Sequence, residues 1–297
     1  MILISLISSL IFFTLIRLKN PVCLFPDSVR YLSGEKLHFP FNLRWLIPYV
    51  LKRDKRLWLW VTSIATILIP PLTYLYLISL GLNERLALYG SLLVLGLPGI
   101  FHFNVIGILI DSIAIDLCLG SAICFNFGLY VPAVVFLILA SLSKESSPVW
   151  ITLFSMSFYP LFAFLIPLAI HYLNPPAKTD LPTLQQPLIQ GHPEIRAEYL
   201  LKHPLKAGWI YNNWLSPEMY LQWGICIFAV LYTGMAWQWV LAGVVIAYSQ
   251  CLVATDSARL YQYSFPLVIY AAIQVLPLEW FPILLILHLF NPIKIKI

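Results

Sequence analysis

Charged side chains are scarce in this chain: they make up 10% of its 297 residues, while hydrophobic residues make up 60%. A soluble domain carries about 25% charged residues, because its surface must face water. So few charges exclude an ordinary soluble domain. Apolar runs of roughly 17–25 residues, long enough to cross a ~30 Å hydrocarbon core as helices, recur along the sequence. The sequence therefore predicts an all-α polytopic membrane protein, with a single transmembrane domain over residues 1–297.

Two other signatures are missing. The apolar segment Met1–Ile16 has no basic start, and no small-residue cleavage site follows it, which argues against a removed signal peptide. We therefore expect a retained first span at about Ile2–Leu18. The apolar runs are continuous and do not alternate with polar residues, which excludes a β-barrel.

Ligand-type spacings are also absent. Four of the five cysteines lie in apolar runs, with no C-x-x-C and no histidine pairing, so neither a metal site nor a disulfide framework is assigned. The net charge of +5 suits anionic lipids or phosphates but is too small to imply nucleic acid.

The apolar runs predict about ten or eleven transmembrane helices. Pro160 favours a short hairpin over one long helix, because an interior proline removes a hydrogen bond and kinks or ends a helix. The expected spans after the first are Leu57–Leu80, Leu86–Ile100, Ile108–Cys124, Val131–Ser143, Val149–Phe158, Leu161–Leu173, Tyr220–Tyr232, Trp237–Val253, Leu260–Val275 and Phe281–Phe290.

Two polar regions interrupt these runs. Residues 19–56 mix Trp and Leu with Lys and Arg in their second half, which is typical of a helix lying in the membrane interface. Residues 174–216 form a proline-broken loop, followed by a short helix that starts at Pro193 and is interrupted at Pro204. We interpret both regions as non-cytoplasmic loops.

Counting spans from a cytoplasmic Met1 brings several charged segments to the same far face. This convergence depends on the hairpin at Pro160, since a single helix there would invert everything after it. The segment Lys52–Arg56 opposes the assignment, because short cytoplasmic loops normally hold the excess of Lys and Arg. Either the topology is inverted, or these cations bind lipid phosphates of the far leaflet. The converging segments are Asp27 with Arg30, Lys144 with Glu145, the 174–216 loop and Asp256–Pro266.

Charges also occur inside apolar runs. Asp111 and Asp116 lie in "GILIDSIAIDLCLG", although a charge at mid-bilayer costs about 2.5–3.5 kcal/mol even on lenient scales. At 3.6 residues per turn they project roughly 140° apart, so they do not form a carboxylate pair on one face. Asp111 either pairs structurally with Lys144 or caps a helix, or it has a functional role. The alternative explanation for Arg259 is simple snorkelling of its side chain to the membrane interface. The alternative explanation for the basic residues of the second polar region is a solvated basic face, formed by Arg196, Lys202, His203 and Lys206.

Five motifs together resemble bacterial integral-membrane glycosyltransferases of the GT-C class. A first span is followed by "PDSVRYL", which is similar to that family's loop aspartate in a D-x-x-x-Y setting, and by "PFNLRWLIP", which is similar to its P-F-x-x-R-x-L-x-P stretch. Further on, "LIDSIAIDL", "LASLSKESSPVWI" and "DSARLYQYSFPLVI" look like its helix-entry aspartate, its lysine-containing junction and its late arginine-to-proline segment. The motifs keep the family's order over most of the chain.

The chain departs from the family's pattern in two ways. It has no D-x-D after the first span, so a divalent metal, which the resemblance leaves open, is not supported and no cofactor is required. It also has no soluble C-terminal domain of the kind that many larger members carry.

The resemblance implies a GT-C-like bundle that moves a sugar from a polyprenyl-phosphate carrier to a glycan, lipid or protein acceptor, with inversion. The implied location is an inner bacterial membrane, among membrane lipids, with the site on the non-cytoplasmic face. Asp27 is the candidate base, because the acceptor must lose its proton as the new bond forms. Fixed cations would stabilise the leaving phosphate. The candidate phosphate- or carrier-binding cations are Arg259, Lys144, Arg44, Arg30, Lys202, Lys206 and Arg196, and the expected pocket residues are Tyr31, Asp111, Glu145, Asp256 and Tyr263.

Two other functions remain open from the sequence. A transporter or flippase for a lipid-linked or anionic solute would use the same charges, but such proteins often carry internal repeats or paired broken helices, and no repeat is evident. In a non-catalytic membrane subunit, the charges would serve as assembly contacts.

Overall fold

The computed structural model describes residues 1–23, 26–33, 43–52, 54–107, 109–175, 214, 223, 226–227, 237–252 and 261–289, without the side chains of residues 26, 27, 30, 33, 98, 102, 103, 261 and 262. These ranges hold helices and no β-strand, as predicted, with one isolated bridge between Cys23 and Gly107. The elements are α1 (Ile2–Lys19), α2 (Pro26–Ser33), α3 (Leu46–Leu51), α4 (Lys55–Ser79), α5 (Glu84–Leu93), η2 (Val94–Gly96), η3 (Pro98–His102), α6 (Phe103–Ile106), α7 (Asp111–Asn126), α8 (Tyr130–Ser143), α9 (Ser147–Phe154), η4 (Tyr159–Phe164), α10 (Leu165–Leu173), α13 (Trp237–Cys251), η8 (Tyr261–Ser264), α15 (Phe265–Val275), η9 (Leu278–Trp280) and α16 (Phe281–Leu289).

Among the described residues, two helices, α1 and α4, are each long and apolar enough to cross a membrane. The number rises to four if two bent helix pairs each count as one span: Glu84–Gly96 with Gly99–Ile106, bent by 70°, and Phe265–Val275 with Leu278–Leu289, bent by 118°. The expected span Leu86–Ile100 is therefore not one straight helix, because 3₁₀ and π turns follow α5. The total of ten or eleven spans stays a prediction.

Helix α1 presents its small polar side chains to the protein and its large apolar ones outward. Ser5 and Ser9 are its buried residues, while leucines and isoleucines along the helix are exposed. Small residues at helix contacts and apolar residues outside are typical of membrane helices. The Ser9 hydroxyl donates to the carbonyl of Ile67 at 2.8 Å. That carbonyl needs a donor because Pro71, four residues later in α4, has no N–H.

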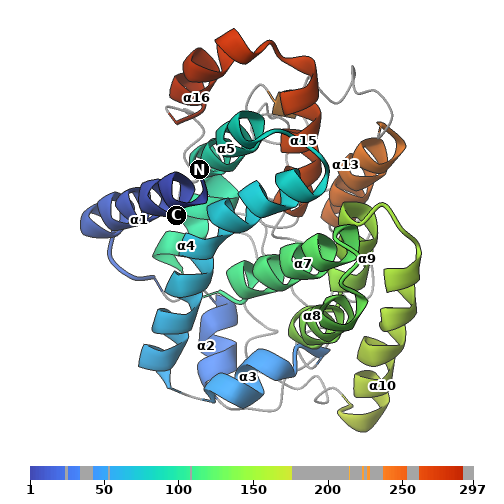
Figure 1. The fold of residues 1–297 in the computed structure, drawn as a ribbon. Helices are drawn as coiled ribbons and strands as arrows, with labels where there is room; N and C mark the ends of the chain where they lie inside the picture. Colours follow the sequence, from blue (N-terminus) through green and yellow to red (C-terminus); the bar gives the residue numbers. More distant parts are fainter. Residues whose placement is uncertain are drawn as a thin grey trace.

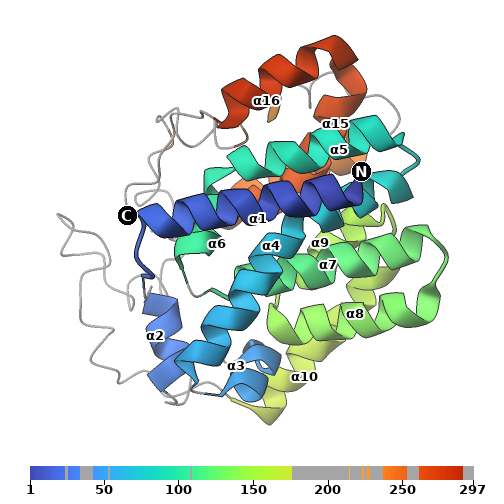
Figure 2. The ribbon, with the colours of Figure 1, turned by 60° about the vertical axis from the view of Figure 1, so that its left-hand side comes forward.

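Helix α7 lies in the middle of the bundle, packed against α4, α8 and α9 (Figure 1). Tight turns join the neighbouring helices: Gly81 (φ 84°) follows α4, and Gly128 (φ 74°) lies between α7 and α8, both in the left-handed region that glycine adopts without strain. Asp54 begins α4 as its N-cap and accepts hydrogen bonds from the backbone of Arg56 and Leu57. Figure 2 shows α1 crossing α4 and running beside α5.

The apolar stretch around Pro160 is broken into two helical segments, as predicted. Helix α9 ends at Phe154, and a new helical segment begins at Tyr159 and continues through η4 into α10. The break lies four residues before Pro160, at Met156, whose φ of 51° cannot continue a right-handed helix. The chain reverses direction there (Figure 1).

The short helices α2 and α3 lie at one end of the bundle, and α16 lies at the opposite end (Figures 1 and 2). Trp45, which precedes α3, and Tyr49 of α3 stack with ring centroids 4.6 Å apart, and both are exposed. Exposed aromatic rings next to basic residues fit the interfacial segment that the sequence predicts over residues 19–56. Most of the 174–216 loop lies outside the described residues.

Candidate functional site: a buried ion-pair network

Arg44, in the segment before α3, binds the carboxylate of Glu145 through two hydrogen bonds. Its Nε donates to Oε2 and its Nη2 to Oε1, each at 2.9 Å. Its remaining terminal nitrogen, Nη1, donates to the hydroxyl of Tyr31 on α2, also at 2.9 Å. A guanidinium that engages both carboxylate oxygens in this way is held in one orientation. Arg44 therefore connects α2 and the α3 segment to the junction between α8 and α9.

Lys144, the neighbour of Glu145, pairs with a different carboxylate. Its Nζ lies 2.5 Å from Oδ1 of Asp111, the first residue of α7. The Tyr263 hydroxyl donates to the same carboxylate oxygen at 2.8 Å, and the Lys144 ammonium lies 4.0 Å from the centroid of the Tyr263 ring. Lys144 is 2% exposed and Asp111 is 4% exposed. The pairing that the sequence left open as a structural alternative is therefore present.

The backbone at the α8–α9 junction explains why adjacent residues reach different partners. Lys144 follows α8 in an extended conformation (φ −151°, ψ 129°). Consecutive side chains of an extended backbone point to opposite sides. Helix α9 then begins at Ser147, with Pro148 in its first turn, where a missing N–H costs no hydrogen bond. The junction thus sends Lys144 toward α7 and Glu145 toward Arg44.

Two tryptophans support the network, and the sequence analysis did not identify them. Trp58 of α4 stacks on Tyr31 with ring centroids 5.5 Å apart, and its indole N–H donates to the carbonyl of Lys52. Trp150 of α9 stacks on Tyr263 at 5.8 Å. Both tryptophans are fully buried. Their sequence signal was weak, because each lies in an apolar run where a tryptophan also fits an ordinary core or an aromatic belt.

The charges of these residues balance within the described part of the chain, since Arg44 and Lys144 face the carboxylates of Glu145 and Asp111. Glu145 lies between two helices, outside the apolar spans. Burial by itself raises the pKa of Glu145, but the charge and hydrogen bonds of Arg44, together with the charge of Lys144, lower this pKa below its ordinary value of 4.5. Glu145 is therefore held as a carboxylate at neutral pH.

Six of the residues singled out from the sequence thus lie in two hydrogen-bonded groups, which the adjacent residues Lys144 and Glu145 join through the backbone into what we call the ion-pair network: Tyr31, Arg44 and Glu145 in one group, and Asp111, Lys144 and Tyr263 in the other. Asp116 is not a member, and one of its carboxylate oxygens is buried without a hydrogen-bond partner in the described structure. The backbone of α2 includes Asp27 and Arg30, whose side chains are outside the description. Arg196, Lys202, Lys206, Asp256 and Arg259 also lie outside the described residues.

Across the described ranges, no three His, Cys, Asp or Glu side chains lie close enough together to hold a metal ion. The network contains two carboxylates, but each already faces a cation. The described residues therefore neither add to nor weaken the argument from the absent D-x-D motif about a divalent metal.

Comparison with known proteins adds no relative. No protein-family model, no curated protein and no solved structure matches the chain. The likeness to GT-C glycosyltransferases thus rests on the motifs of this sequence.

Proposed function

We propose that this chain is a membrane transferase that moves a sugar from a polyprenyl-phosphate carrier to an acceptor at one membrane face. The observation that carries the proposal is that residues distant in the sequence, Tyr31, Arg44, Asp111 and Tyr263, all bond to partners at or beside the adjacent pair Lys144 and Glu145. Each of the five motifs that resemble the GT-C class supplies at least one of these residues. A purely apolar bundle has no need of such costly groups at a shared position.

In the proposed reaction, Asp27, which precedes the network residues in the sequence, has a role of its own. The acceptor oxygen attacks the anomeric carbon, the bond from that carbon to the phosphate oxygen breaks, and its electron pair stays on the phosphate. The acceptor proton passes to a carboxylate base. Asp27 is the proposed base, and it lies in α2 one helical turn before Tyr31, which is hydrogen-bonded to Arg44.

Arg44 and Lys144 are already paired with carboxylates, so their proposed role is to present oriented dipoles to the site and to hold the interfacial segment against α7 and α9. Arg30 and Arg259, with Arg196, Lys202 and Lys206, are the proposed direct partners of the carrier phosphate. Beside the network, the Trp150 indole N–H is buried and has no hydrogen-bond partner among the described residues.

A second candidate is a transporter or flippase for a lipid-linked or anionic solute, and the bent helix pairs favour it. The pair Phe265–Val275 and Leu278–Leu289 begins two residues after Tyr263 and bends by 118° at its break, residues 276–277. Broken helices are typical of secondary transporters.

Reconstitution into vesicles separates the two candidates. Purified protein is supplied with a radiolabelled polyprenyl-phosphate sugar and either a lipid or a glycan acceptor, and product is followed by chromatography. The proposal expects covalent transfer of label to the acceptor. Movement of the label across the bilayer without a covalent product would support the transporter and contradict the transferase.

A further inference from the structure

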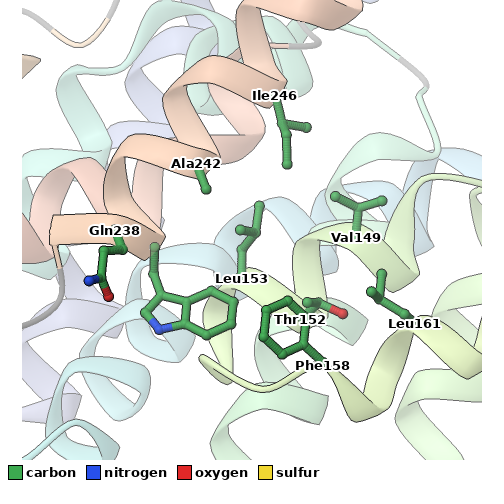
Figure 3. Close-up of a pocket in the computed structure, with 9 residues that line it drawn as sticks. Val149, Thr152, Leu153, Phe158, Leu161, Gln238, Ala242 and Ile246 are labelled. Carbon is green, nitrogen blue, oxygen red and sulfur yellow. The ribbon is translucent and has the colours of Figure 1, made fainter.

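A cavity of about 400 Å³ lies between α9, η4 and α13, on the side of α9 away from the ion-pair network (Figure 3). Its walls are apolar except for Thr152 of α9 and Gln238 of α13. Phe158 and Trp239 approach each other across it, with ring centroids 5.1 Å apart. Val149, Thr152 and Leu153 face this cavity, whereas Trp150 and Phe154 face the network and α4. The cavity is thus separate from the proposed catalytic site.

The Thr152 hydroxyl differs from every other threonine hydroxyl in the described part of the chain. Thr14, Thr62, Thr66 and Thr73 each donate to the carbonyl four residues earlier in their own helix, at 2.7–2.8 Å. Thr152 is 4% exposed, and its Oγ1 is buried without a hydrogen-bond partner. A buried hydroxyl that lacks a partner costs free energy, although an intrahelical acceptor is normally within reach. Thr152 lines the cavity, so a rotation of its side chain can point the unbonded hydroxyl toward an acceptor there.

Exposed aromatic side chains lie at the helix ends beside the cavity. Phe158, Tyr159 and Trp237 lie around it at the ends of η4 and α13, and all three are exposed. Exposed aromatic rings at helix ends gather at the level of the lipid headgroups and ester groups. An apolar cavity at that depth, with one hydroxyl in its wall, fits the upper part of an acyl chain together with its ester carbonyl.

We propose that this cavity binds one acyl chain of a membrane glycerophospholipid, with the Thr152 hydroxyl donating to the ester carbonyl. The apolar walls hold the first methylene groups of the chain, and Gln238 lies at the start of α13 on the headgroup side. The proposal does not depend on the transferase activity, because it uses none of the residues of the ion-pair network.

The test measures lipid binding to the purified, delipidated full-length chain by native mass spectrometry. The probes are phosphatidylglycerol and its di-ether analogue, which has the same headgroup and chains but no ester carbonyl. Loss of one neutral hydrogen bond weakens binding by about two- to tenfold. Wild-type protein is therefore expected to bind the di-ether lipid two- to tenfold more weakly than the ester lipid.

Variants test whether the difference in binding between the two lipids comes from the Thr152 hydroxyl. Thr152→Val keeps the side-chain shape, and it is expected to bind both lipids with the lower affinity. The matched control is Thr73→Val, whose hydroxyl is bonded within α4, and it should bind like wild type. Ala242→Phe fills the cavity and should remove the specific binding of both lipids.

Equal binding of the ester and ether lipids by wild-type protein would overturn the proposal, and this measurement needs no variant to fold. An unchanged ester preference in Thr152→Val, or tight retention of a polyprenol that has no ester group, would overturn it as well.

Discussion

Arg44 and Glu145 lie 101 residues apart in the sequence, yet the guanidinium of one engages both carboxylate oxygens of the other. The contact joins the interfacial segment before α3 to the junction between α8 and α9. Because Arg44 also donates to Tyr31, a single side chain fixes three separate parts of the fold around one position.

Arg44→Lys tests this connection. Lysine keeps the charge but lacks the planar guanidinium group with its several N–H donors. It therefore cannot donate to both Glu145 oxygens and to Tyr31 in the same geometry. We expect a loss of about 1–3 kcal/mol in the free energy of unfolding. The measurement is thermal unfolding in detergent. Arg85→Lys, at an exposed position of α5, is the matched control and should leave the melting temperature unchanged. Equal melting of both variants would contradict the role of Arg44.

The Asp111–Lys144 pair predicts strong non-additivity. Lys144→Met alone leaves a buried carboxylate without its cation and should cost about 3–5 kcal/mol. Asp111→Asn together with Lys144→Met leaves no uncompensated charge and should recover most of that loss. Thermal melting of the single and double variants gives the coupling. Additive losses would mean that the two side chains do not interact.

Tyr263→Phe removes the hydroxyl that donates to Asp111 while keeping the ring beside the Lys144 ammonium. The lost hydrogen bond to a buried carboxylate should cost about 1.5–3 kcal/mol. Tyr89→Phe is the control, because Tyr89 stacks on Phe281 but its hydroxyl makes no hydrogen bond in the described structure. If both variants melt alike, the Tyr263 hydroxyl does not stabilise Asp111.

The lowered pKa of Glu145 predicts a pH dependence of stability. A carboxylate whose pKa is lower in the folded state than in the unfolded state contributes stability above its unfolded pKa and loses it as pH falls through the folded pKa. The unfolded value is about 4.5, so this contribution is complete at neutral pH and disappears progressively below that value. Melting curves of wild type and Glu145→Gln should therefore converge on acidification, and parallel curves down to strongly acidic pH would contradict the prediction.

The sequence predicted the helical fold and the residues of the network better than the network's pairings. Residues Asp111 and Lys144 attracted attention because charges are costly in apolar runs, and this argument also indicated their pairing. The contact of Arg44 with Glu145 was not predicted, because Glu145 reaches its partner only through the extended backbone at Lys144. No local pattern encodes that conformation.

Helix lengths and the cavity were harder to predict for a related reason. The stretch after α5 is as apolar as a continuous span, but it folds into 3₁₀ and π turns that hydropathy does not distinguish. The Thr152 position also looked like an ordinary part of an apolar run. Its hydroxyl is unusual only in comparison with the hydrogen-bonded threonines of α1 and α4, and those hydrogen bonds are visible only in the three-dimensional structure.

The rate of sugar transfer by Asp27→Asn tests the account most directly. Removal of a general base lowers a rate by about 10²- to 10⁴-fold, so transfer from a radiolabelled polyprenyl-phosphate sugar should fall by at least about a hundredfold, with carrier binding retained. Asp54→Asn is the matched control, because asparagine caps α4 as well as aspartate does, and it should transfer at the wild-type rate. Transfer by Asp27→Asn within a factor of about two of wild type would contradict the central claim, since a general base contributes far more than that.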